Sequence, residues 1–168
     1  GPSSKIVRNM GEKDKAKLIM EKAGVPVVPG YHGKIQDKNF LEQTAKKIGY
    51  PILIKARAGG GGRGMRVAET STKFLSALEE ATSEAKTNFK DKNCLLEKYI
   101  SKARHIEIQI FGDKYGNVIH LFDRDCSLQR RQQKIIEEAP CPELNNDIRT
   151  FLGDLSVKAA RSIKYEGA

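Results

Sequence analysis

Apolar residues recur at intervals of three and four in four segments of the chain, and this spacing predicts amphipathic helices. The segments are residues 9–23, 38–48, 71–89 and 147–163. Asp37 is a suitable N-cap for the second helix, while Gly24 and Gly49 end the first two. The connector 25–30 contains two prolines, so we expect it to be extended without forming a central strand.

Shorter apolar runs predict β-strands. These runs are residues 51–55, 65–69 and 94–100, followed by 105–110 and 118–122. The last two are separated by a turn containing glycine and asparagine, which predicts a hairpin. Strict alternation in the first hairpin strand places His105, Glu107 and Gln109 on one face. That polar face is either the hydrated side of an antiparallel sheet or part of a site.

The order of these elements predicts an α+β fold. Residues 39–100 follow the order helix, strand, strand, helix, strand, which describes a small antiparallel sheet with helices. The hairpin and the last helix follow from residue 101 onward, after a change in composition at Ser101.

The loop between the strands 51–55 and 65–69 is dense in glycine: residues 59–62 are four consecutive glycines. Glycine reaches positive φ and lets the backbone approach a ligand closely. Successive N–H groups in such a loop form a concave anion site, and Lys55, Arg63 and Arg66 add positive charge. The sequence predicts a phosphate-binding loop; the alternative is a surface loop without a ligand.

The spacing of the glycines distinguishes three kinds of phosphate site. Gly59, Gly61 and Gly64 match the dinucleotide motif, but that motif opens into a helix and this loop runs into a predicted strand. A P-loop needs Gly-Lys followed by Ser or Thr, which the loop does not contain. A glycine-rich flap between antiparallel strands, similar to that of kinases, fits the pattern.

A second concentration of positive charge lies in residues 124–134, where arginines and Lys134 alternate with amide side chains. This density suits an anion site, and the alternative is a solvated basic turn. Lys13, at the start of the first helix, is by itself most simply a solvated lysine.

Composition narrows the classes of protein. The 168 residues are 39% hydrophobic and 30% charged, as in folded proteins of one domain or two small ones. The net charge of +9 suits an acidic partner, but aromatic residues make up only 7% and no nucleic-acid motif is present. No apolar run approaches the ~20 residues of a membrane span. The three scattered cysteines favour a reducing compartment.

Several motifs, taken together and in this order, resemble the biotin carboxylase family of ATP-grasp enzymes. They are Met10-Gly-Glu-Lys13, Lys55-x-x-x-Gly-Gly-Gly-Gly-Arg-Gly-Met65, Glu97-Lys-Tyr99, Arg104-His-Ile-Glu-Ile-Gln109 and Arg124-Asp-Cys-Ser-x-Gln-Arg-Arg-x-Gln-Lys134. The resemblance covers essentially the whole chain. Tyr31-His-Gly33 further resembles the α subunits of acyl-CoA carboxylases of the methylcrotonoyl type.

The resemblance implies a function and a set of site residues. The family uses MgATP to activate bicarbonate as carboxyphosphate and then carboxylates biotin, so ATP, Mg²⁺ and biotin are the implied cofactors. Lys134 is the implied catalytic residue, facing bicarbonate or carboxyphosphate. The implied nucleotide-binding residues are Lys13 and Lys55 at the phosphates, Gly60, Gly61 and Gly62 over them, Met65 near adenine, Glu97, Lys98 and Ile100 at the adenine edge, and His105, Gln129 and Gln132 near the ribose and phosphates.

Two departures from the family accompany this resemblance. Gln132 is a neutral amide where the family commonly has histidine. The family's Mg²⁺-binding carboxylates and the residues that complete its bicarbonate and biotin sites are expected beyond Ala168. We therefore predict no metal ligands in this chain and no turnover by this piece alone.

The resemblance also implies a domain organisation: a linker helix and connector at 1–38, the ATP-grasp lid at 39–100, and the incomplete start of the C-terminal ATP-grasp subdomain at 101–168. Expected partners are ATP, bicarbonate, a biotinylated carrier domain and the remaining biotin carboxylase subdomains, in the cytoplasm or the mitochondrial matrix. Neither a membrane nor nucleic acid is expected. The alternatives are a non-enzymatic basic module that binds nucleic acid or protein, and another ATP-grasp ligase.

Overall fold

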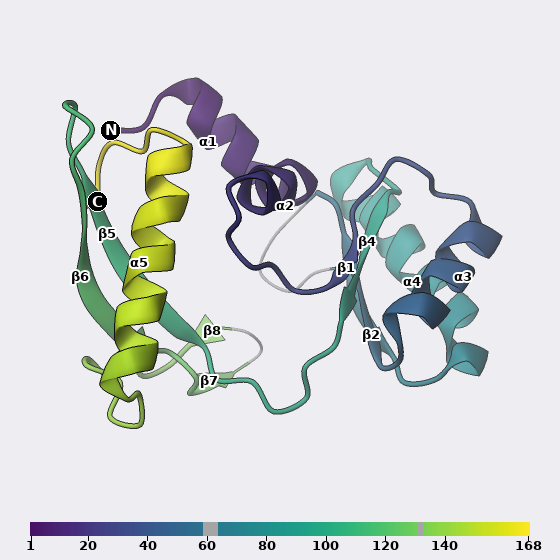
Figure 1. Ribbon diagram of the computed structural model, residues 1–168. Coiled ribbons are helices and arrows are strands. Elements are labelled where there is room, and N and C mark those ends of the chain that lie inside the picture. Colours follow the sequence, from purple (N-terminus) through teal and green to yellow (C-terminus); the bar gives the residue numbers. More distant parts are fainter. Residues whose placement is uncertain (59–63, 131–132) are drawn as a thin grey trace. The chain divides into compact units, whose positions relative to one another are not determined.

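A computed structural model describes residues 1–58, 64–130 and 133–168 (Figure 1). The chain divides into two compact units. The sheet unit comprises Glu12–Lys17 and Val27–Ser101, and the hairpin unit comprises Gly1–Gly11, Leu18–Pro26 and Lys102–Ala168. The division into 1–38, 39–100 and 101–168 remains a prediction.

The sheet unit is a four-stranded antiparallel sheet with two helices; the sequence predicted both helices and three of the strands, but not the two-residue β1. Its elements are β1 (Gly30–Tyr31), α3 (Lys38–Ile48), β2 (Ile52–Ala56), β3 (Met65–Ala68), α4 (Ser71–Phe89) and β4 (Cys94–Lys98). The strand order is β1-β4-β2-β3, so the short β1 that follows the proline-containing connector lies at an edge. The α+β prediction is confirmed.

The helices α3 and α4 lie on the same side of this sheet (Figure 1). Alternation along β2 directs Ile52, Ile54 and Ala56 into the core beneath the helices. Phe74 of α4 fills the centre of that core and is fully buried. The opposite side chains of β2, Leu53 and Lys55, lie on the face that the helices leave uncovered.

Local signals set the helix ends where the sequence predicted them. The carboxylate of Asp37 accepts a hydrogen bond from the backbone N–H of Phe40 at 2.9 Å, which caps α3. Gly49 follows with φ of 90°, a conformation that glycine adopts without steric cost, and ends the helix.

The hairpin unit combines two antiparallel strands with one long helix. Strands β5 (Ile106–Gly112) and β6 (Val118–Asp125) form the predicted hairpin, and α5 (Asn146–Ser162) lies across it (Figure 1). Gly153 is the point of close approach, because a Cβ there would come within 2.5 Å of His120 Nε2. The short strands β7 (Gln129–Arg130) and β8 (Gln133–Lys134) pair with each other.

The N-terminal helix differs from the prediction. Instead of one helix over 9–23, the structure has α1 (Ser4–Gly11) and α2 (Lys13–Lys22). Glycine is a poor interior helix residue because it loses the most backbone entropy, and Gly11 ends α1. None of the helices in the described ranges has the length and apolar character that a membrane-spanning helix needs.

Candidate nucleotide and anion sites

The uncovered face of the sheet unit carries the first candidate site. The β-register pairs Lys55 with Met65 and Leu53 with Glu97, and paired residues in an antiparallel sheet share a face. Lys55, Met65 and Glu97 therefore lie together on the face opposite α3 and α4. Lys55 and Met65 are also close in sequence to the two ends of the glycine loop.

Glu97 is the centre of this face. Its side chain is only 8% exposed, and it forms ion pairs with two lysines. Lys17 Nζ lies 2.7 Å from Oε1, and Lys55 Nζ contacts Oε2. Lys17 also donates to the carbonyl oxygen of Val28 at 3.2 Å. We call Lys13, Lys17, Lys55 and Glu97 the lysine cluster.

The charges of the lysine cluster affect one another. Burial would raise the pKa of Glu97, but the hydrogen bonds from Lys17 and Lys55 outweigh it and hold the pKa below its usual value. Burial, followed by repulsion from Lys55, lowers the pKa of Lys13. Lys13 Nζ donates to the carbonyl oxygen of Ala56 at 3.3 Å. Three lysines against one carboxylate leave an excess of positive charge beside the loop, which suits a phosphate.

Two residues that the sequence assigned to this site have side chains on the other face. Arg66 pairs in register with Ile54 of the core face and forms ion pairs with Glu80 and Glu84 of α4. The expectation that Arg66 adds positive charge beside the loop was therefore wrong. Lys98 donates to the carbonyl oxygens of Gly49 (2.8 Å) and Tyr50 (2.7 Å).

Lys98 follows Glu97 directly, and successive side chains of a strand point to opposite faces. A contact between Lys98 and a nucleotide on the Glu97 face must consequently come from its backbone. Ile100, just beyond β4, is 53% exposed. Gly60, Gly61, Gly62, Arg63 and Gln132 lie outside the described residues.

The hairpin unit carries a second set of charges around Glu107 of β5, which we call the Glu107 cluster. Lys134 Nζ lies 2.6 Å from Oε2 of Glu107, and Arg124 Nη2 lies 3.4 Å from the same atom. His105 Nε2 lies 3.1 Å from Oε1. The side chain of Glu107 is 27% exposed, so water reaches this cluster.

A chain of hydrogen bonds orients the histidine of this cluster. Gln129 Nε2 donates to the carbonyl oxygen of Cys126 at 2.8 Å and lies 2.6 Å from His105 Nδ1. With the amide nitrogen donating to Nδ1, the ring proton of a neutral His105 is on Nε2, where it points at Glu107. The structure thus brings together His105, Gln129 and Lys134, three residues that the sequence assigned.

The protonation of Lys134 bears on its chemistry. The hydrogen bond to Glu107 raises the pKa of Lys134, and the same bond is the main cause of the lowered pKa of Glu107. Lys134 is accordingly an ammonium group across neutral pH. It suits the stabilisation of an anion rather than proton abstraction.

Among the described residues, Glu107, Cys126 and Glu137 present possible metal ligands within 4.8 Å of one another. Lys134 and Arg124 already form ion pairs with both carboxylates. Burial raises the pKa of the Cys126 thiol, so it is not a thiolate at neutral pH. This donor set does not fit Mg²⁺, which prefers oxygen ligands of uncompensated carboxylates and water.

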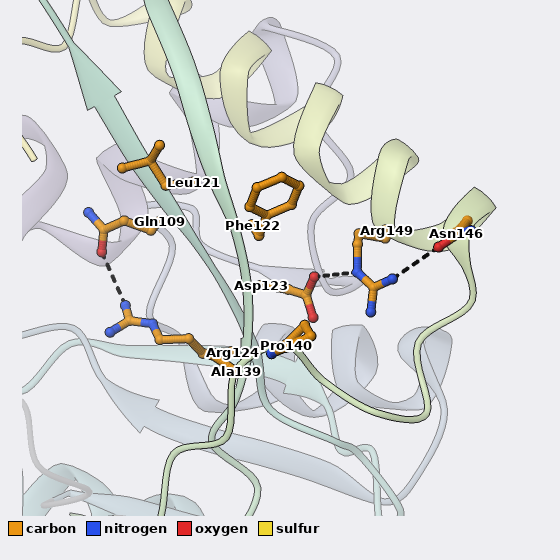
Figure 2. A pocket seen from close by; sticks show the side chains of 9 residues that line it. All are labelled: Gln109, Leu121, Phe122, Asp123, Arg124, Ala139, Pro140, Asn146 and Arg149. Atoms are coloured by element: carbon orange, nitrogen blue, oxygen red, sulfur yellow. Dashed lines mark hydrogen bonds and ion pairs between the residues drawn. The ribbon is translucent and has the colours of Figure 1, made fainter.

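A pocket of about 700 Å³ in the hairpin unit is separate from the predicted nucleotide-binding residues (Figure 2). Its walls include Leu121 and Phe122, and its charged groups are already paired. Asp123 accepts from Arg149 Nε at 2.6 Å, and Arg124 donates to Gln109 at 3.3 Å (Figure 2). The pocket therefore presents apolar surface, and most of its polar groups already have hydrogen-bond partners within the protein.

Sequence reasoning missed Lys17 and did not assign a role to Glu107 or Glu137. Lys17 follows Lys13 by four residues on α2, and this spacing puts both on one helix face. That spacing was the available signal for Lys17. Its contact with Glu97 depends on packing.

The chain matches the family described as carbamoyl-phosphate synthase L chain, ATP binding domain, over residues 12–168. It belongs to this family of ATP-binding domains. Within that class it is similar to biotin carboxylases. It is 53% identical over 168 residues to methylcrotonoyl-CoA carboxylase subunit alpha, mitochondrial, of Mus musculus, covering the whole chain and 23% of that protein.

Solved structures agree with these relatives. A biotin carboxylase–β-γ-ATP complex from Campylobacter jejuni matches with a TM-score of 0.95 and 50% identity over 99% of this chain and 37% of that one. The biotin carboxylase domain of the Hydrogenobacter thermophilus 2-oxoglutarate carboxylase, in complex with MgADP, ADP and bicarbonate, matches with a TM-score of 0.93 and 49% identity over the same shares. The predicted resemblance to biotin carboxylases is confirmed.

Proposed function

We propose that this chain is the ATP-binding part of a biotin carboxylase, a ligase that uses MgATP and bicarbonate to carboxylate biotin through carboxyphosphate. The family match and the biotin carboxylase relatives support this proposal. The chain spans 23% of the mouse relative's length, so the activity belongs to the longer parent protein. The comparisons do not favour a nucleic-acid-binding module.

The lysine cluster is the observation that carries the proposal. Lys13 and Lys55 are positioned by different elements, α2 and β2, near the strand ends that border the glycine loop. Phosphoryl transfer requires positioning and neutralisation of phosphate charge rather than covalent chemistry by the protein. Lysines half-shielded from water neutralise a phosphate more effectively than exposed ones, because the local dielectric constant is lower.

In the reaction, a bicarbonate oxygen attacks the γ-phosphorus of ATP, the bond to ADP breaks, and carboxyphosphate forms. Carboxyphosphate then transfers its carboxyl group to the ureido nitrogen of biotin, with phosphate as the leaving group and the acceptor of the ureido N–H proton. We assign Lys134 as the ammonium group that stabilises bicarbonate or carboxyphosphate. His105 and Gln129 are held beside it and are assigned to the nucleotide's ribose and phosphates.

The remaining assignments follow the same proposal. Met65 packs near adenine, while Glu97, Lys98 and Ile100 read its edge, Lys98 through its backbone. Residues 39–100 are the lid subdomain and 101–168 begin the C-terminal ATP-grasp subdomain. Mg²⁺ is held by carboxylates of the parent outside this chain, since the Glu107 set does not fit it. The partners are a biotinylated carrier domain and the other biotin carboxylase subdomains, in the cytoplasm or the mitochondrial matrix.

A calorimetric titration of the 168-residue chain with MgATP tests the proposal. We expect saturable binding that is reduced at least about tenfold in Lys55→Ala, because one charge-assisted bond from a half-buried lysine to phosphate is lost. Lys73→Ala is the matched control, since Lys73 is an exposed lysine of α4 in the same unit. Its affinity should equal that of the unchanged chain.

Two results would contradict this function. One is the absence of saturable binding at millimolar MgATP. The other is an equal loss in Lys55→Ala and Lys73→Ala, which would indicate only non-specific attraction to a basic surface. A steep salt dependence with tighter binding to RNA or DNA than to ATP would instead support the nucleic-acid alternative.

A further inference from the structure

We propose that Lys17 is a positioning residue for nucleotide binding: it keeps the buried Glu97 carboxylate paired while Lys55 leaves that carboxylate to bind phosphate. The inference rests on the proposed function of the lysine cluster. Lys17 lies outside the motifs that carry the family resemblance.

In the structure, Lys55 forms an ion pair with Glu97. An ammonium group has three N–H donors, but a phosphate oxygen and a carboxylate compete for the same charge. For Lys55 to neutralise a phosphate, its ion pair with Glu97 must weaken or break. When Lys55 binds phosphate, the negative charge of Glu97 therefore has to be compensated by another cation.

Leaving that charge alone would be costly. The Glu97 side chain is 8% exposed, and removal of one partner from a buried ion pair leaves an uncompensated charge in a poorly hydrated place. The second cation is already in contact: Lys17 Nζ is 2.7 Å from the other carboxylate oxygen, Oε1. Glu97 thus keeps one ion pair when Lys55 moves.

Lys17 is held in place independently of Lys55. It donates to the carbonyl oxygen of Val28 at 3.2 Å, and its side chain is 17% exposed, less than the 25% of Lys55. Lys13, one helical turn earlier, donates to the carbonyl oxygen of Ala56 in β2, and burial and the charge of Lys55 lower its pKa against the attraction of Glu97. The two lysines on one face of α2 therefore have different tasks: Lys13 is assigned to the nucleotide and Lys17 to Glu97.

A double-mutant cycle tests this division. Lys17→Met keeps the aliphatic stem and removes the charge, and we expect MgATP affinity to fall at least about tenfold, because Glu97 then keeps only the ion pair with Lys55 of the two that the described residues form with it. Lys17→Arg, which keeps the charge, should retain affinity within about threefold. In the Glu97→Gln background no carboxylate remains to be compensated, so Lys17→Met should change affinity by less than about twofold.

The cycle separates positioning from a merely structural role. An equal loss from Lys17→Met in both backgrounds would overturn the inference, because Lys17 would then act without Glu97. Unchanged affinity in Lys17→Met, with the loss in Lys55→Ala intact, would overturn it while leaving the proposed function standing. Unchanged affinity in Lys55→Ala would overturn both. The thermal midpoint of each variant verifies that it is folded at the titration temperature.

Discussion

Glu97 in the sheet unit and Glu107 in the hairpin unit are chemically alike. Each is a strand carboxylate that accepts from a lysine of a distant segment, and each has a second cationic partner. They differ in exposure, 8% for the Glu97 side chain and 27% for that of Glu107. Burial opposes the cations that lower the pKa of both carboxylates, but it is the largest single influence only on the pKa of Glu97; for Glu107 the hydrogen bond from Lys134 is larger.

The effect of a carboxylate–lysine ion pair on stability therefore depends on how deeply the carboxylate is buried. Around Glu107, water solvates the partners and screens them, so rearrangement to admit an anion costs little. Around Glu97, each charge depends on its neighbours, because water cannot replace a lost partner. The lysine cluster is a buried set of strongly coupled charges, whereas the charges of the Glu107 cluster interact through more water and are coupled less strongly. Three predictions test this contrast.

The largest expected effect is that of removing both cations from Glu97. In the double variant Lys17→Met and Lys55→Met, the free energy of unfolding at pH 7 should fall by about 3–5 kcal/mol, since a buried carboxylate is left unpaired or must be protonated. Urea denaturation measures this. Adding Glu97→Gln to the double variant should recover most of the loss. A loss below about 1 kcal/mol would show that Glu97 is effectively hydrated.

The second prediction tests whether the stability lost on removing a cation depends on the burial of the carboxylate or on the unit in which the carboxylate lies. Asp123 lies in the hairpin unit, yet its side chain is 0% exposed and pairs with Arg149 at 2.6 Å. Arg149→Met should lower the free energy of unfolding by about 3 kcal/mol, with the Cys141 N–H still donating to Asp123.

The control is Arg161→Met, because Arg161 is an exposed arginine on the same helix, α5. It should leave stability nearly unchanged. If both arginine variants lose the same free energy, helix propensity or general charge explains the effect and burial does not.

The smallest effect is expected for Glu107→Gln, whose thermal midpoint at pH 7 should stay within about 2 °C of the unchanged chain. The folded-state pKa of Glu107 is lowered from 4.5, so its contribution is present above that pH and is lost as the pH falls through the folded-state value. The raised pKa of Lys134 keeps its charge until the pH exceeds 10.5.

Thermal scans from pH 3 to pH 9 measure how the stability contribution of Glu107 depends on pH. This range includes the ordinary carboxyl pKa of about 4 and stays below the lysine pKa of about 10. The small difference between Glu107→Gln and the unchanged chain should be constant over most of that range and vanish at its acid end. It should also shrink in about 1 M salt. A difference that grows on acidification would contradict the lowered pKa.

Much of the fold was available from local pattern. The helices α3, α4 and α5, the strand pair around the glycine loop and the hairpin β5–β6 were predicted close to their observed bounds. Periodicity and caps such as Asp37 act within a few residues, which is why sequence reasoning finds them. The break at Gly11 was missed, because the apolar spacing continues across it.

One irregularity of the hairpin was beyond such reasoning. The register of β5 and β6 shifts between Ile108 and Ile110, so that Leu121 and Phe122 together oppose Gln109. Phe122 has φ of 61°, an unfavourable conformation for a residue with a bulky side chain. Alternation alone gives no sign of an inserted residue, since a bulge is decided by how the two strands fit across the whole pair.

The sequence by itself determined the family, most of the longer helices and strands, and the residues of the motifs, because these depend on residue types at short spacing. It also indicated that Lys55 and Met65 border the glycine loop. Only the tertiary structure decided that Arg66 faces α4 and that Lys17 meets Glu97. The physical reason is that contacts between distant segments, and the burial that gives them their strength, arise from packing of whole elements and have no local signature in the chain.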